Sequence, residues 1–81
     1  MNRMKITFTL TQTNKGISYD IQVSHEQRIK DTLQILRENL PMFADVSDVD
    51  YVIDADSGKN LSTEDTYGTA RVYSGAELLI N

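Results

Sequence analysis

The chain has 81 residues, with twelve acidic and eight basic side chains and a formal net charge of -4. This length gives room for one hydrophobic core, so we expect a single domain spanning residues 1–81. The negative charge and the scattered basic residues argue against a nucleic-acid partner. The lack of cysteines excludes disulfides, thiolate metal sites and cysteine nucleophiles, and it favours a reducing compartment.

The N-terminal residues pass directly into an alternating apolar and polar run. No apolar segment reaches the length of a signal sequence core, or the roughly 18 to 20 residues of a membrane span. We therefore expect a cytoplasmic protein with no direct membrane insertion.

Two alternating runs predict a β-hairpin at the start of the chain. Residues 4–11 alternate with period two, and residues 17–23 repeat the pattern after the turn residues 13–16, which include Asn14 and Gly16. One face of the first strand is then apolar, and its members are Met4, Ile6, Phe8 and Leu10.

The next segment has the pattern of an amphipathic helix. Ser24 and Gln27 have the spacing of an N-terminal capping box. An apolar stripe follows at helical spacing, formed by Ile29, Leu33, Leu36 and Leu40. Pro41 disfavours a helical conformation at the residue before it, so we expect the helix to end there after about three to four turns.

The second half of the chain contains short strands joined by turns. After an irregular acidic connection over residues 41–50, we expect a strand at 51–54, a turn at 56–59 leading to Leu61, and a last strand at 76–80. This order predicts an α+β fold in which a mixed four- to five-stranded sheet packs on one helix, with the last strand beside the first. The expected core adds to the hairpin and helix residues Ile53, Leu61, Tyr67, Val72, Leu78 and Ile80.

The spacing of five of these core residues, Leu61, Tyr67, Val72, Leu78 and Ile80, resembles that of the ubiquitin superfamily. The run Val72-Tyr73-Ser74-Gly75-Ala76-Glu77-Leu78 is similar to the apolar-x-x-Gly-x-x-Leu segment before the last strand of the YukD/EsaB-like proteins. These are accessory proteins of bacterial type VII secretion. The resemblance implies a ubiquitin-like β-grasp with the order β-β-α-β-β-β. It also implies a non-enzymatic protein-protein interaction module, cytosolic and part of a type VII secretion system.

The sequence ends Leu79-Ile80-Asn81, without the flexible Gly-Gly tail that conjugation requires. We therefore expect that this chain is not conjugated to targets. The alternative is a ubiquitin-type modifier or sulfur-carrier protein whose Gly-Gly tail is absent from this chain.

Two groups of residues have the composition of catalytic or metal sites, but the wrong spacing. Ser24, His25 and Glu26 are adjacent, so their side chains diverge and cannot form a hydrolase relay, and we interpret them as helix-capping residues. Five aspartates could suggest calcium, but they do not match the EF-hand pattern and are expected to form a solvated edge. They are Asp45, Asp48, Asp50, Asp54 and Asp56. We therefore expect no catalytic residues, no metal and no cofactor.

The outer face of the sheet, turned away from the helix, is the candidate protein-binding surface, because ubiquitin-like domains commonly bind through it. The resemblance implies a protein partner such as a cytosolic domain of a membrane secretion component, while self-association is left open. Mixed charges around Lys30 and Arg37 instead indicate a solvated helix surface. The residues expected on the outer face are Lys5, Thr7, Thr9, Ser18, Asp20, Gln22, Val52 and Leu79. An inert, solvated outer face is the competing interpretation.

Overall fold

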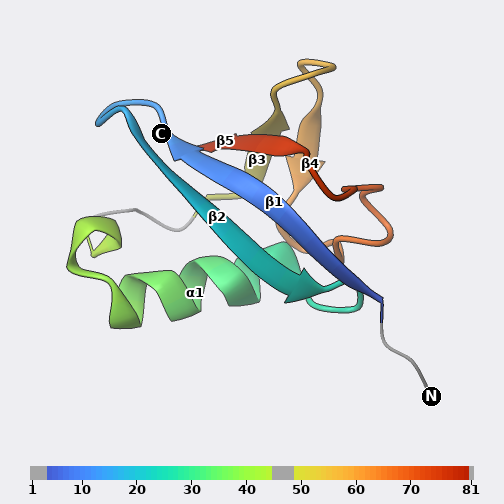
Figure 1. Cartoon of the computed structure of the whole chain (residues 1–81), viewed down its shortest axis with the longest axis horizontal. Coiled ribbons are helices and arrows are strands. Elements are labelled where there is room, and N and C mark those ends of the chain that lie inside the picture. Colours follow the sequence, from blue (N-terminus) through green and yellow to red (C-terminus); the bar gives the residue numbers. More distant parts are fainter. Residues whose placement is uncertain (1–3, 45–48, 81) are drawn as a thin grey trace.

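A computed structural model of the chain describes residues 4–44 and 49–80. The described residues form a sheet and one α-helix, with a short 3-10 helix after it (Figure 1). In chain order the elements are β1 (Lys5–Gln12), β2 (Ile17–Ser24), α1 (Ile29–Asn39), η1 (Pro41–Phe43), β3 (Tyr51–Asp54), β4 (Asn60–Ser62) and β5 (Glu77–Ile80).

The five strands are arranged in the order β2-β1-β5-β3-β4. The last strand, β5, runs parallel to β1 in the centre of the sheet, and the other three neighbouring pairs are antiparallel. Helix α1 covers one face of this sheet (Figure 1). The predicted α+β architecture, its element order and the pairing of the last strand with the first are therefore confirmed.

Helix α1 begins at Ile29, five residues after the predicted cap at Ser24. The Ser24 hydroxyl instead accepts a hydrogen bond from the Glu26 amide within a turn. The first helical amides are satisfied by a distant segment, because Ile29 N–H donates to the Asp65 carbonyl and Lys30 N–H donates to the Thr63 carbonyl. The capping prediction is wrong, since backbone groups from the segment after β4 satisfy the N–H groups that a cap normally would.

The end of the helix follows the prediction from Pro41. Leu40 leaves the helical region at φ -117° and ψ 115°, and its amide still donates to the Leu36 carbonyl. The first residues of the following connection form η1 where an irregular segment was expected, and η1 buries Phe43 to 1% exposure. The Phe43 ring packs on Tyr19 of β2 at a centroid distance of 5.5 Å. Phe43 is a core residue that the sequence interpretation missed.

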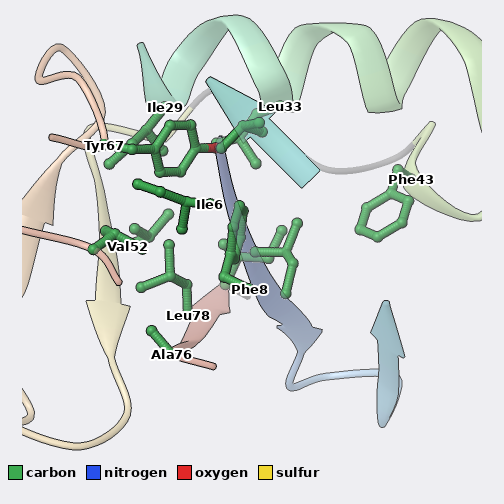
Figure 2. Packing of buried hydrophobic residues seen from close by; sticks show 13 residues of the cluster. Ile6, Phe8, Ile29, Leu33, Phe43, Val52, Tyr67, Ala76 and Leu78 are labelled. Atoms are coloured by element: carbon green, nitrogen blue, oxygen red, sulfur yellow. The ribbon is translucent and has the colours of Figure 1, made fainter. Parts of the chain in front are cut away.

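The core lies between α1 and the inner face of the sheet, and Tyr67 is drawn on its helix side, near Ile29 and Leu33 (Figure 2). Its ring is 1% exposed and lies 5.1 Å from the ring of Phe8. In Figure 2 its hydroxyl points toward the helix, where the Thr32 hydroxyl accepts from Gln27 Nε2 at 2.7 Å.

Two core predictions fail at the sheet. Met4 precedes β1 and is 65% exposed, so the apolar face of that strand begins at Ile6. In β3, Val52 is 1% exposed and pairs with Leu61, which places both on the inner face. The predicted core residue Ile53 therefore lies on the outer face. Hydrophobicity alone could not decide this, because both residues are aliphatic.

Gly68 lies against His25, with no room for a side chain. A Cβ at this position would come within 2.9 Å of the imidazole Nδ1 of His25 and 3.1 Å of its carbonyl oxygen. That carbonyl also accepts the Gly68 amide at 2.8 Å, so it cannot move away without weakening the bond. We expect Gly68→Ala to lower the free energy of unfolding by about 1–3 kcal/mol, measured by urea titration.

The double variant Gly68→Ala/His25→Ala separates the two contacts. Removing the imidazole relieves the contact with Nδ1 but leaves the backbone carbonyl in place. We expect the double variant to recover only part of the stability lost by Gly68→Ala, relative to His25→Ala alone. Equal stability of Gly68→Ala and the unmodified chain would contradict this close approach.

Candidate binding surface

The outer face of the sheet divides into a polar half and an apolar corner. The polar half lies on β1 and β2, where side chains bond across neighbouring strands. Thr9 Oγ1 donates to Asp20 Oδ1 at 2.7 Å, and Thr11 lies within 2.9 Å of the Ser18 hydroxyl. The Thr11 hydroxyl also lies 2.7 Å from Glu77 Oε2 on β5. Part of the polar surface is thus already hydrogen-bonded to neighbouring side chains of the same sheet.

Seven of the eight residues predicted for the binding face do lie on the outer face. The strand register places Thr7 opposite Gln22, Thr9 opposite Asp20, and Leu79 between Thr11 and Ile53. The full set is Lys5, Thr7, Thr9, Ser18, Asp20, Gln22 and Leu79. Val52 is the exception, because it is buried on the inner face beneath the helix.

The apolar corner consists of Tyr51, Ile53 and Leu79. Tyr51 is 50% exposed, and Ile53 and Leu79 are half-buried. Ile53 pairs directly with Leu79, and Tyr51 lies two residues before Ile53 on the same face. Ile53 and Tyr51 were missed in the sequence interpretation. Leu79 was the signal that could have revealed Ile53, because the correct register between β3 and β5 places the two residues beside each other.

A hollow of about 200 Å³ adjoins the apolar corner, at the end of the sheet where β5 ends and β3 begins. We call it the corner hollow. It is lined by Thr13, Val49, Asp50, Tyr51, Ile53, Leu79 and Ile80. Asp50 is the only charged residue among these lining residues, and it is exposed.

Thr63 fixes the segment that carries Asp50. Thr63 is 4% exposed, its amide donates to the Asp50 carbonyl at 3.0 Å, and its hydroxyl donates to the Val49 carbonyl at 2.8 Å. Within the described residues, the Asp50 carboxylate makes no ion pair or hydrogen bond. Asp50 also lines a second hollow together with Lys30 and Arg37 of α1, so it lies between the helix and the corner hollow.

Ser24, His25 and Asp54, which were considered as catalytic or calcium-binding residues, instead make contacts that support the fold. His25 packs against Gly68, and Ser24 accepts the Glu26 amide, so these neighbours form no relay. Asp54 caps the turn after β3, accepting from the Asp56 amide at 3.1 Å and from the Ser57 hydroxyl at 3.1 Å.

Asp45 and Asp48 lie outside the described residues, as does Asn81. Over residues 4–44 and 49–80, no three acidic, histidine or cysteine side chains are grouped so as to hold a metal ion. Over the same ranges, no helix is long and apolar enough to cross a membrane.

Two polar contacts at the surface, away from the apolar corner, shift the pKa of one of their partners. Lys30 on α1 pairs with Glu64 at 2.7 Å, and this hydrogen-bonded ammonium lowers the pKa of the Glu64 carboxyl. Tyr73, in the turn before β5, donates to Asp56, and this bond to a carboxylate raises the pKa of the tyrosine. Both pairs are exposed, so they stabilise the fold little.

No protein-family model matches the sequence, and no curated protein matches it significantly. Solved structures do match. A protein designed on the basis of ubiquitin has a TM-score of 0.69 at 17% identity, covering 95% of this chain and 87% of that one. The C-terminal ubiquitin-like domain of mouse tubulin-specific chaperone e has a TM-score of 0.69 at 12% identity, covering 98% and 87%. The UBL domain of Plasmodium falciparum Dsk2 has a TM-score of 0.64 at 18% identity, covering 94% and 97%. The chain therefore has the ubiquitin-like β-grasp fold that its core spacing predicted.

Proposed function

We propose that the chain forms one non-enzymatic domain over residues 1–81 that binds a protein partner through the outer face of its sheet. The observation that carries this proposal is the apolar corner, where Tyr51, Ile53 and Leu79 leave apolar surface open beside hydrogen-bonded polar residues. An apolar centre with a polar rim is the usual composition of a protein interface.

The polar half of the face supplies the rim. Lys5, Thr7 and Gln22 are exposed on the same side of the sheet as the apolar corner. In this arrangement Leu79 is central, because it lies between Thr11 of the polar half and Ile53 of the corner. Interface energy concentrates in such central apolar residues, and the rim mainly excludes water.

We further propose that the partner is a cytosolic domain of a membrane component of type VII secretion. The support is the likeness of residues 72–78 to the segment before the last strand of YukD/EsaB-like proteins. In this role the protein is a cytosolic accessory that docks onto the secretion machinery.

Leu79→Glu tests the binding face. We expect it to weaken binding to the cytosolic domains of type VII membrane components at least about tenfold, because it places a charge in the apolar centre. Surface plasmon resonance with each purified domain measures the change.

The matched control is Ile35→Glu, which makes the same kind of change at a 51%-exposed position on α1. We expect it to leave the affinity unchanged. No binding by the unmodified chain to any of these domains would refute the secretion role. Equal losses in the two variants would refute the outer face as the binding surface.

A further inference from the structure

The edge strand β2 offers a second place for a partner to bind, apart from the apolar corner. We propose that an extended segment of another protein pairs with the open side of β2 in antiparallel orientation and adds a sixth strand to the sheet. The side chains of this segment alternate, with aliphatic residues on the helix side and a basic residue opposite Asp20 on the outer face.

The backbone hydrogen bonds of β1 show which side of β2 is open. Thr9 N–H donates to the Ala76 carbonyl at 2.9 Å, just before β5. Thr13 N–H donates to the Ile80 carbonyl of β5 at 2.8 Å. Neighbouring residues of a strand direct their backbone groups to opposite sides, so the even-numbered residues of β1 bond toward β2. The residues of β2 opposite them are Ile17, Tyr19, Ile21 and Val23.

The alternate residues of β2, which are Ser18, Asp20 and Gln22, therefore direct their N–H and C=O groups away from the sheet. All three residues are exposed, and within the described part of the chain no group outside the strands hydrogen-bonds to their backbones. The pairing with β1 has no bulge, and β2 contains no proline or lysine, which are common protections of an edge. The opposite edge strand, β4, has only three residues. The edge at β2 is thus the longer one for a partner strand.

The helix-side surface of β2 is apolar and only partly covered. Ile17, Tyr19 and Ile21 are half-buried on this face. Their neighbours on β1 are buried more completely, since Leu10 and Phe8 are each 2% exposed. The difference arises because β1 lies between two strands, whereas β2 has a neighbour on one side. A strand added beside β2 with aliphatic side chains on this face would bury the remaining apolar surface.

Asp20 determines which strands the edge can accept. It is the only charged residue of β2, and it lies on the outer face opposite Thr9. The fullest antiparallel pairing of two copies would place Asp20 directly opposite Asp20, and Ser18 opposite Gln22. Like charges in opposite positions destabilise a strand pair, and each copy carries a net charge of -4. A segment with lysine or arginine at this position meets an opposite charge, so the edge favours another protein over a second copy.

Blocked peptides test the proposal by NMR titration of the isotopically labelled full chain. The parent peptide is Ac-Gly-Val-Lys-Val-Lys-Val-Gly-NH₂. One derivative is N-methylated at both lysines, and the other at the last two valines. In the proposed pairing the lysine N–H groups donate to β2, whereas the valine N–H groups point away from it. We expect the parent and the valine-methylated peptide to shift the amides of Ser18, Asp20 and Gln22. The lysine-methylated peptide should bind at least about tenfold more weakly than the parent.

Asp20→Asn and Asp31→Asn form a matched pair, since each removes one negative charge and changes the net charge from -4 to -3. Asp31 is exposed on α1 and lines a hollow with residues near β3 and β4, so it is not part of the edge. We expect Asp20→Asn to weaken binding of the parent peptide about threefold to fivefold and Asp31→Asn to leave it unchanged.

Equal binding of the two methylated peptides, or a loss confined to the valine-methylated one, would overturn the proposed pairing. Shifts confined to residues away from β2, an absence of shifts, or equal effects of the two aspartate variants would overturn it as well. Self-association of the unmodified chain through β2, measured by sedimentation velocity, would refute another protein as the occupant. The outer-face proposal fails separately, because Leu79 lies on β5, with β1 between it and β2, and Leu79→Glu should retain peptide binding.

Discussion

Val52→Asp is expected to unfold the chain, whereas Ile53→Asp leaves it folded. Val52 is 1% exposed and packs in the core beneath α1, so its replacement buries a carboxylate without a cation. Such a change costs several kcal/mol, a large share of the roughly 5–15 kcal/mol that stabilise a typical protein. Ile53 is half-buried on the outer face, where a carboxylate remains hydrated, and we expect a loss of about 1 kcal/mol.

Far-ultraviolet circular dichroism and urea titration of both variants measure this difference. Val52→Ala is the comparison that removes volume without adding charge, and it should remain folded with a loss of about 2 kcal/mol. The opposite result, a folded Val52→Asp and an unfolded Ile53→Asp, would mean that β3 presents its other face to the helix.

The contrast within β3 explains which parts of the fold could be predicted. In β1 the alternation of threonine with Ile6, Phe8 and Leu10 assigns the faces from the sequence alone. In β3 two neighbouring aliphatic residues satisfy either face, and the pairing with β5 decides between them. A shift of one residue in a strand exchanges its two faces, so this single ambiguity misplaced both Val52 and Ile53.

Long-range contacts account for the other errors. The sequence around Ser24 has the pattern of a cap, yet the helix begins at Ile29, because carbonyls near Thr63 and Asp65 accept its first amides. Phe43 follows a proline in a segment without periodicity, and only its packing against Tyr19 makes it a core residue. Neither contact leaves a local pattern in the sequence.

The candidate site was only partly predictable, because local alternation reveals its polar half whereas long-range contacts form the corner hollow. The polar half follows from the alternation of β1 and β2, so its residues were placed correctly. The corner hollow is built from three separate segments, around Thr13, Val49 to Ile53, and Leu79 to Ile80. No spacing rule brings such segments together, so the corner hollow could not be predicted from the sequence.

Ionisation of Tyr67 is expected to destabilise the folded chain at alkaline pH. Burial of its hydroxyl raises its pKa to about 12, from an ordinary value near 10. Below pH 10 the tyrosine is protonated in both the folded and the unfolded chain. Between pH 10 and 12, Tyr67 is ionised in the unfolded chain but still mainly protonated in the folded chain. The unfolded chain therefore binds fewer protons, and the free energy of unfolding falls as pH rises. The loss is about 1.4 kcal/mol at pH 11.

Tyr67→Phe isolates this effect from the titration of lysines and other tyrosines. At pH 9 we expect the variant to be less stable by about 1 kcal/mol, because it loses the polar interaction of the buried hydroxyl with the Thr32 side chain. At pH 11 the unmodified chain has lost its advantage, so urea titrations should give nearly equal free energies of unfolding. Tyr73→Phe is the control, because Tyr73 is 51% exposed and this variant retains the buried hydroxyl of Tyr67. A stability gap between Tyr67→Phe and the unmodified chain that stays constant from pH 9 to 11 would show that water reaches this hydroxyl in the folded state.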